Sequence, residues 1–209
     1  MTAEVARKIE SFIPLIDENR FQDIYNELSA KGSLWRSSNL MGEFTTAFIE
    51  SDIDLLNYME NIPRCFCYCG ESDKGPFVIN IPDNIKSIGD SCFSVCSYVN
   101  KVIFSSSSPI TTISYGSFSH MNKLTEVILP PNLEIIEESA FHGSDKLQKV
   151  STLPISLTVI GTDAFRHCFK LTSITYEGTK KQFQMIEKKP RWRYRSIKQV
   201  ICSDGIIKY

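Results

Sequence analysis

The stretch Leu124-Thr-Glu-Val127-Ile-Leu129-Pro130-Pro-Asn-Leu133-Glu-Ile-Ile136-Glu-Glu-Ser-Ala140-Phe141 decides the fold of this 209-residue chain, because variants of it recur before and after it. Its clearest marker is a phenylalanine that returns after 25, 23 and 24 residues, at Phe93, Phe118, Phe141 and Phe165. Two apolar series keep the same steps, namely Ile85, Ile110, Leu133, Leu157 and Ile88, Ile113, Ile136, Ile160. Several registers locked to one period predict a repeat array rather than a globular enzyme domain.

The quoted unit also predicts how one coil is built. Leu124, Val127 and Leu129 predict a short strand with its apolar side chains inward, and Pro130 ends it because proline cannot donate a further ladder bond. The segment from Leu133 to Phe141 predicts a return of turn or 3₁₀ conformation. The residue before each phenylalanine is small, which lets neighbouring coils approach: Cys92, Ser117, Ala140 and Ala164. Since no unit can bury its own apolar face, we expect the units to stack with their phenylalanine rings in one buried column.

Two further stretches carry the same pattern, Ile79-Asn-Ile-Pro-Asp-Asn-Ile-Lys-Ser-Ile-Gly-Asp-Ser-Cys-Phe93 and Ile155-Ser-Leu-Thr-Val-Ile-Gly-Thr-Asp-Ala-Phe165. They resemble the BspA-like type of leucine-rich repeat, which reads roughly L-x-x-I-x-I-P-x-x-[VL]-x-x-I-G-x-x-A-F-x-x-C-x-x-L. The resemblance implies an α/β solenoid of about four to five coils. It also implies a scaffold used for adhesion and recognition rather than for one enzymatic activity.

The chain divides into three segments. Apolar residues at helical spacing in residues 1–64 predict about four short helices that form an N-terminal cap, residues 65–178 form the solenoid, and residues 179–209 form an α/β C-terminal cap. Such caps are expected because a solenoid exposes its apolar core at both ends. In the C-terminal cap we predict a helix from Lys180 to Lys188, a turn at Pro190, and a strand from Gln199 to Cys202. The run that begins at Tyr176 is similar to the capping segment that often ends the resembled proteins.

Location and redox state can be predicted only broadly. The charged opening has no apolar run of signal-peptide length, and no segment approaches the ~18 apolar residues of a membrane span. We therefore expect a cytoplasmic protein, or a protein of the host cytoplasm or virion if it is encoded by a phage. The chain has seven cysteines, and Cys92, Cys96 and Cys168 occupy small positions of the repeat, where we expect free, buried thiols.

Residue types that carry out catalysis do not converge in this sequence. His120 and His167 stand at equivalent positions two units apart, about 9 to 10 Å along a stack of strands, and His142 is one residue out of register between them. We therefore expect surface histidines that share no site. Cys65-Phe-Cys67-Tyr-Cys69 has no second cysteine pair at a spacing usable for zinc. The sequence predicts no enzyme, no cofactor and no metal.

The outward positions of the strands are the first candidate surface. Ile103 and Ile128 lie on adjacent strands and should form a small exposed apolar centre with a charged rim, a combination typical of protein interfaces. The predicted partner-binding residues are Lys101, Ile103, Glu126, Ile128, Lys149, Ser151, Ser173 and Thr175.

A second candidate surface follows from the charge distribution. Residues 1–64 carry 6 basic and 11 acidic side chains, and residues 65–178 carry 8 basic and 11 acidic ones. Residues 179–209 carry 9 basic and 2 acidic side chains. The net charge therefore differs strongly between the segments, although that of the whole chain is −1. Basic and aromatic residues alternate in the last segment, a pattern that can bind phosphates and stack bases. The alternative is that Trp192 packs on the last coil while the arginines stay solvated. This basic patch comprises Lys188, Lys189, Arg191, Trp192, Arg193 and Arg195.

Three functions are compatible with these surfaces. The favoured one is a non-enzymatic scaffold that binds a protein partner through the repeats, as a bacterial or phage factor acting on a host protein. The second is a structural or virion-associated subunit that self-assembles through its oppositely charged ends. The third is nucleic-acid binding through the basic patch. No membrane partner is expected.

Overall fold

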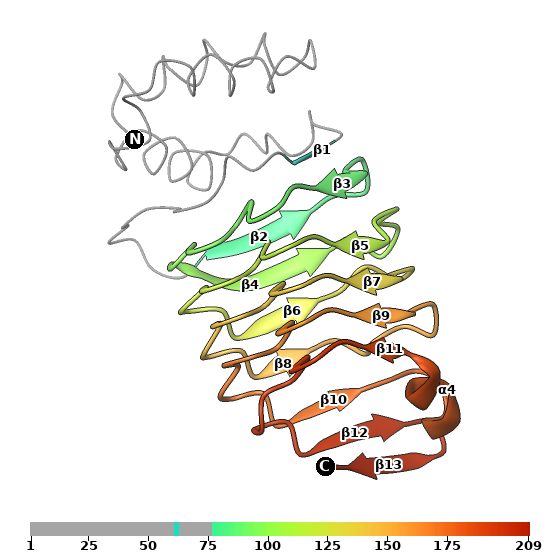
Figure 1. Cartoon of the computed structure of the whole chain (residues 1–209). Coiled ribbons are helices and arrows are strands. Elements are labelled where there is room, and N and C mark those ends of the chain that lie inside the picture. The colour runs from blue at the N-terminus through green and yellow to red at the C-terminus, as the bar shows by residue number, and fades with distance from the viewer. Residues whose placement is uncertain (1–60, 63–76) are drawn as a thin grey trace, which may run out of the picture.

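The computed structural model describes residues 61–62 and 77–209 (Figure 1). The predicted N-terminal helices and the series Cys65, Cys67 and Cys69 lie outside the described residues. Asn61 and Ile62, which the sequence analysis placed in the N-terminal cap, form strand β1 (Asn61–Ile62), and β1 pairs in parallel with β3 (Ser87–Ile88). The ladder of coils therefore extends to residues before Phe77.

The strands predicted from the repeat form one side of a solenoid, and each coil contributes one of them (Figure 1). The first sheet is parallel and contains β2 (Phe77–Ile81), β4 (Val99–Phe104), β6 (Glu126–Ile128) and β8 (Lys149–Val150). The second contains β10 (Ser173–Thr175), β12 (Gln199–Cys202) and the antiparallel β13 (Gly205–Lys208). Val102, Val127 and Val150 are paired across the first sheet and buried, as the sequence predicts.

The return segments also form a ladder, which the sequence did not predict. They contain the two-residue strands β5 (Thr112–Ile113), β7 (Ile135–Ile136), β9 (Val159–Ile160) and β11 (Glu187–Lys188), in the order β11-β9-β7-β5. Turns flank these strands, where turn or 3₁₀ conformation was predicted. Ile113, Ile136 and Ile160 are fully buried. The repeat array is thus confirmed as a solenoid, and in the described ranges its helical content is limited to the short C-terminal helix α4.

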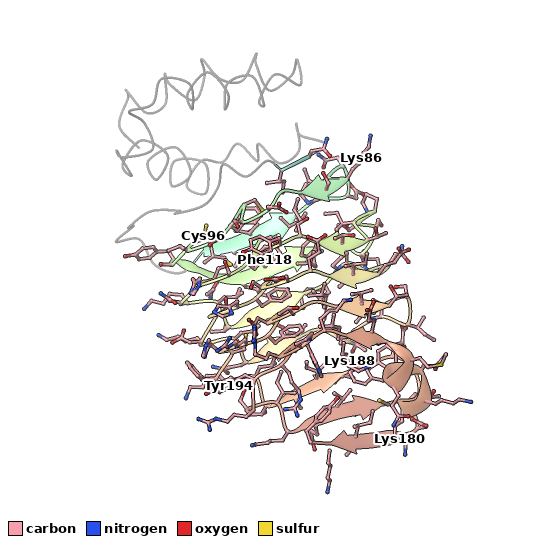
Figure 2. All side chains as sticks on the ribbon, viewed as in Figure 1. Lys86, Cys96, Phe118, Lys180, Lys188 and Tyr194 are labelled. Carbon is pink, nitrogen blue, oxygen red and sulfur yellow. The ribbon has the colours of Figure 1, made fainter. Side chains whose placement is uncertain are left out.

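The phenylalanine column lies between the two ladders (Figure 2, Phe118). Ring centroids of Phe93, Phe118, Phe141 and Phe165 are 5.5, 5.7 and 5.2 Å apart in succession, and successive rings are tilted by only 8 to 12°. Each ring is 2% exposed or less. The backbone beside the column is bonded from coil to coil, since Phe118 and Phe141 donate their N–H groups to the next coil over 2.9 Å. Side-chain stacking and main-chain bonding therefore fix one register together.

The C-terminal cap differs from its predicted form at one helix end. Helix α4 (Lys180–Met185) starts at Thr179, which forms a capping box with Gln182, and it buries Phe183. The helix was predicted to continue to Lys188, but it ends at Met185 because Glu187 and Lys188 pair with β9. The strand predicted from Gln199 to Cys202 is confirmed as β12. Within residues 61–62 and 77–209 no helix is long and apolar enough to cross a bilayer.

The three cysteines of the repeat are buried as predicted, but one of them is not a free thiol. Cys92, Cys96 and Cys168 are all fully buried. Cys168 is a free thiol that donates to the carbonyl oxygen of Phe141, and burial raises its pKa far above the ordinary range. Cys96 is disulfide-bonded, so the expectation of a free thiol is wrong at this position. A second cysteine close enough to bond with Cys96 could not be deduced from the period of the repeat.

Truncating the phenylalanine column should destabilise the whole solenoid. We expect Phe141→Ala to lower the free energy of unfolding by about 3 to 5 kcal/mol, because the cavity would lie between two fully buried rings. Phe169→Ala is the matched control, since Phe169 is 49% exposed and outside the column. Urea unfolding of both variants measures the difference, and equal losses would show that the column is not the core of the fold.

Candidate functional site

The outward surface of strands β2, β4, β6, β8, β10, β12 and β13, which we call the strand face, brings the predicted partner-binding residues together. Lys101 pairs with Glu126 and Ile103 with Ile128 across β4 and β6, as the sequence predicts. Glu126 pairs in turn with Lys149 on β8. The arrangement follows from the two-residue alternation of side chains in a strand, which sends every second residue of each coil outward.

The apolar centre of the strand face is less exposed than predicted. Ile103 and Ile128 are half-buried rather than exposed, because side chains that stand opposite each other on adjacent strands shield one another. The exposed apolar side chains of this face lie nearer its ends, with Val78 45% exposed on β2 and Ile201 37% exposed on β12. The strand face therefore has a flat, partly apolar centre rather than a protruding patch.

Glu126 is the charged centre of the strand face. Its carboxylate oxygens lie 2.7 Å from the ammonium of Lys101 and 2.8 Å from that of Lys149. Hydrogen bonds from Lys101 first, and Lys149 second, lower the pKa of Glu126 below its ordinary value. Two ammonium groups share one carboxylate, so this part of the face has an excess positive charge. The Lys149 side chain is 69% exposed and is the more accessible of the two cations.

A hollow of about 350 Å³ opens in the strand face between β8 and β10. It is lined by Ile128, Gln148, Lys149, Val150, Ser151, Thr152, Ser173 and Thr175. Five of these residues belong to the predicted partner-binding set, which also includes Lys101, Ile103 and Glu126 beside the hollow. The sequence analysis identified the surface but did not predict that it is hollowed.

Several residues of the predicted basic patch form contacts within the C-terminal cap. Trp192 is 8% exposed and packs against the rings of Phe183 and Tyr209, which is the alternative stated from the sequence. The Lys188 ammonium donates to carbonyl oxygens at the end of α4, including those of Phe183 and Ile186. Burial lowers the pKa of Lys188. Figure 2 shows Lys188 beside α4, whereas Tyr194 lies at the edge of the solenoid away from α4.

The arginines of the same segment also contact neighbouring coils. Arg191 donates to both carboxylate oxygens of Asp163, at 2.8 and 3.0 Å, and this hydrogen bonding holds the pKa of Asp163 below its ordinary value. The Arg193 guanidinium lies 3.8 Å from the ring centroid of Tyr209. The exposed members of the set are Lys189, Arg191 and Arg195. The structure therefore disperses the six residues instead of gathering them on one surface.

Three histidines that were expected to share no site are in ring contact. The rings of His120 and His142 have centroids 5.2 Å apart, and those of His142 and His167 are also 5.2 Å apart. The ring of His167 then meets Phe169 at 5.6 Å and Tyr194 at 5.4 Å. We call these five residues the aromatic ladder. The sequence predicted histidines without a shared metal site or catalytic pair and did not predict this ring contact, which forms because the one-residue offset of His142 fills the gap between the other two.

Gly143 makes the offset possible. It stands in the position of His120 and His167 within its own coil and shares their left-handed backbone, with a φ of +71°. A Cβ at Gly143 would lie 2.5 Å from the Nδ1 atom of His120, so only glycine leaves room for that imidazole. The signal was present in the sequence as a glycine where the neighbouring units have histidine.

The environment of His142 perturbs the pKa of its imidazole. Burial is the main cause that lowers its pKa, and the neighbouring His120 and His167 lower it further. Its Nδ1 atom is buried and has no hydrogen-bond partner among the described residues. In the described part of the chain no group of three or more histidine, cysteine or acidic side chains could hold a metal ion. The lowered pKa keeps the His142 imidazole neutral at neutral pH.

Comparison with known proteins identifies the repeat. A sequence profile of the BspA type leucine-rich repeat region matches residues 60–186 in six copies, which is more than half of the chain. Among solved structures the chain is similar to a leucine-rich cell surface protein from Faecalibacterium prausnitzii, with 28% identity and a TM-score of 0.56 over 63% of this chain and 33% of that one. The chain therefore spans about a third of the length of that protein.

Two further solved structures are similar at lower levels. A leucine-rich repeat protein from Eubacterium ventriosum has 24% identity and a TM-score of 0.49, over 73% of this chain and 36% of that one. A leucine-rich repeat protein from Bacteroides ovatus has 24% identity and a TM-score of 0.46, over 70% and 48%. No curated protein matches the chain.

The aromatic ladder should make stability depend on pH. A histidine whose pKa is lowered in the folded state takes up a proton more readily when unfolded, so the free energy of unfolding should fall as the pH drops below the unfolded value of about 6.5. His142→Gln should reduce this loss between pH 7.5 and 5.5, a window above the titration of Glu126 and Asp163. Urea unfolding of the parent and of His142→Gln at both pH values measures this loss of free energy of unfolding.

His120→Gln is the matched control, because His120 is exposed at one end of the aromatic ladder. We expect it to reduce the pH-dependent loss less than His142→Gln does. An unchanged pH dependence in His142→Gln would contradict the assignment of a depressed pKa to this residue.

Proposed function

The chain belongs to the BspA type leucine-rich repeat family, and we propose that it is a non-enzymatic scaffold whose strand face binds a protein partner. The observation that carries the proposal is the convergence of a half-buried isoleucine pair, charged neighbours and a hollow on one surface. An apolar centre with a polar rim is the usual composition of a protein interface. The repeat itself supports a recognition role, since stacked coils give an extended and rigid surface.

The dispersal of the basic patch weighs against the nucleic-acid alternative. Lys188 is bonded to the end of α4, and the Arg191 and Arg193 side chains contact Asp163 and Tyr209. A nucleic-acid groove needs several free cations along one path. Self-assembly through oppositely charged ends is a separate alternative, and light scattering of the purified chain distinguishes it from binding to a different protein.

Origin and location belong to the same proposal. We propose that the chain is a bacterial or phage factor, and the similar proteins of known structure come from bacteria. The cytoplasmic location expected from the sequence stays a prediction. Two observations favour an oxidising compartment instead: the disulfide at Cys96, and the cell-surface description of the similar Faecalibacterium protein.

A charge placed on the strand face should weaken capture of the partner. We expect Ile128→Asp to lower affinity for the protein captured from the native lysate by at least ~2 kcal/mol, or about 30-fold, because a carboxylate in the interface core must be desolvated. Ile155→Asp is the matched control, since Ile155 is 56% exposed and lies outside the hollow. Calorimetric titration with the captured protein measures both.

The fold of each variant must be checked, because Ile128 is half-buried. An Ile128→Asp variant that unfolds like the parent and binds like the parent would remove the strand face as the functional surface. Loss of binding in Ile155→Asp, with Ile128→Asp unaffected, would move the surface to the edge that carries Ile155.

A further inference from the structure

The hollow in the strand face lies beside one extra residue in the coil of β8, which is the fourth coil when the coil of β2 is counted as the first. Val127 and Val150 are 23 positions apart, whereas Leu129 and Leu153 are 24 apart. Ser151 and Thr152 therefore stand where the third coil has only Ile128 and the fifth coil has only Thr175. Two residues opposite one form a β-bulge, which interrupts the ladder locally. Bulges are frequent beside binding sites because they redirect side chains.

On the side of the third coil the bulge is fully bonded. The Ser151 N–H donates to the carbonyl oxygen of Val127 at 2.8 Å. The Leu129 N–H donates to the Ser151 hydroxyl oxygen, also at 2.8 Å, where a regular ladder would use a main-chain carbonyl. The Ser151 hydroxyl thus takes the place of a main-chain acceptor, and the Leu129 N–H of the third coil remains hydrogen-bonded.

On the side of the fifth coil the ladder is open. β8 and β10 are not paired with each other: β8 is the last strand of the first sheet, and β10 belongs to the second. Bonding resumes only beyond the bulge, where the Leu153 N–H donates to the Thr175 carbonyl at 2.9 Å. That carbonyl faces the fourth coil, so the N–H groups of Thr175 and of Ser173, two residues earlier, face the same way. Ser173 and Thr175 both line the hollow, on the side of the fifth coil.

The side chains of the hollow add further donors. Thr152, Ser173 and Thr175 form no side-chain hydrogen bond with another described residue. Lys149 borders the hollow, and the carboxylate that pairs with it among the described residues, Glu126, is shared with Lys101. The same row of the strand face continues through Ser173 and Gln199 to Lys208, with no acidic side chain among them. Donors and positive charge therefore concentrate at one point of the face.

We propose that this hollow is an anchor site for a carboxylate side chain, an aspartate or glutamate in an extended segment of the protein partner. The carboxylate would accept hydrogen bonds from the hydroxyl and main-chain donors and pair with Lys149. Charge-assisted bonds of this kind are stronger than neutral ones. The proposal rests on the proposed function, because it specifies the chemistry of a partner that binds the strand face.

The test is selection of peptides from a random 12-residue display library on the immobilised full-length chain. We expect selected peptides to carry an acidic residue at one common position and to lose at least tenfold in affinity when it is changed to its amide. Lys149→Met and Thr175→Val should each weaken binding of the acidic peptide by a similar factor. The matched controls are Lys146→Met and Thr158→Val, exposed residues that do not line the hollow.

Two further measurements sharpen the test. In Lys149→Met the acidic and amide peptides should bind almost equally, because the cation that discriminates between them is gone. Deleting Thr152 should restore the one-to-one register of the neighbouring coils, close the hollow and abolish the acidic preference. Unfolding in urea shows whether each variant keeps its fold.

Each outcome decides at least one of the two proposals. Selected peptides that are lost in Ile128→Asp but show no acidic preference would overturn the anchor site and leave the strand face as the interface. Peptides that bind Ile128→Asp and Lys149→Met as they bind the parent would overturn both. A selection that yields no peptide competing for the strand face also contradicts the anchor site, since a hollow for one side chain is accessible to a short peptide.

Discussion

The register between the phenylalanine column and the main-chain bonds beside it is the constraint on which the rest of the structure depends. Rings that stack at 5.2 to 5.7 Å require every coil to return its phenylalanine to one line. The N–H groups of those residues bond to the adjacent coil and hold the same line in the backbone. Coil length can therefore vary only in segments away from the column. Each insertion lies on the surface, and its position along the coil determines how it changes the neighbouring strands.

Two insertions illustrate the difference. The second coil has its longer turn after β4, at Ser105 to Ser108, and β4 still pairs with β6 at three positions. The fourth coil has its extra residue directly after β8, between Val150 and the bridge residue Leu153, and β8 is not paired with β10. An extra residue in a turn changes an edge of the solenoid, whereas an extra residue at the end of a strand interrupts the pairing of the sheet. A binding site is therefore proposed beside Ser151 and Thr152 and not at the serine turn.

Much of the fold could be predicted because it follows from period and polarity alone. The column at Phe118 and Phe141, the inward valines and the pairing of Ile103 with Ile128 needed only the repeat spacing and the alternation of a strand. The end of α4 could not be predicted, since Glu187 and Lys188 are helix-compatible residues taken by a strand pairing with β9. The disulfide at Cys96 could not be predicted either, because spacing along one chain does not reveal which side chains meet in space.

The features that the sequence analysis missed share one physical cause. In a regular stack each side chain contacts its own equivalents in the coils before and after, so a row of equivalent positions repeats one chemistry. Different groups converge on one point only when a residue is out of register. His142 is offset by one position, and its ring contacts both of two histidines that stand two coils apart. Thr152 is supernumerary and brings hydroxyls and main-chain donors together beside Lys149. The regular positions of this solenoid thus determine its stability, and the irregular ones determine where its surface can recognise another molecule.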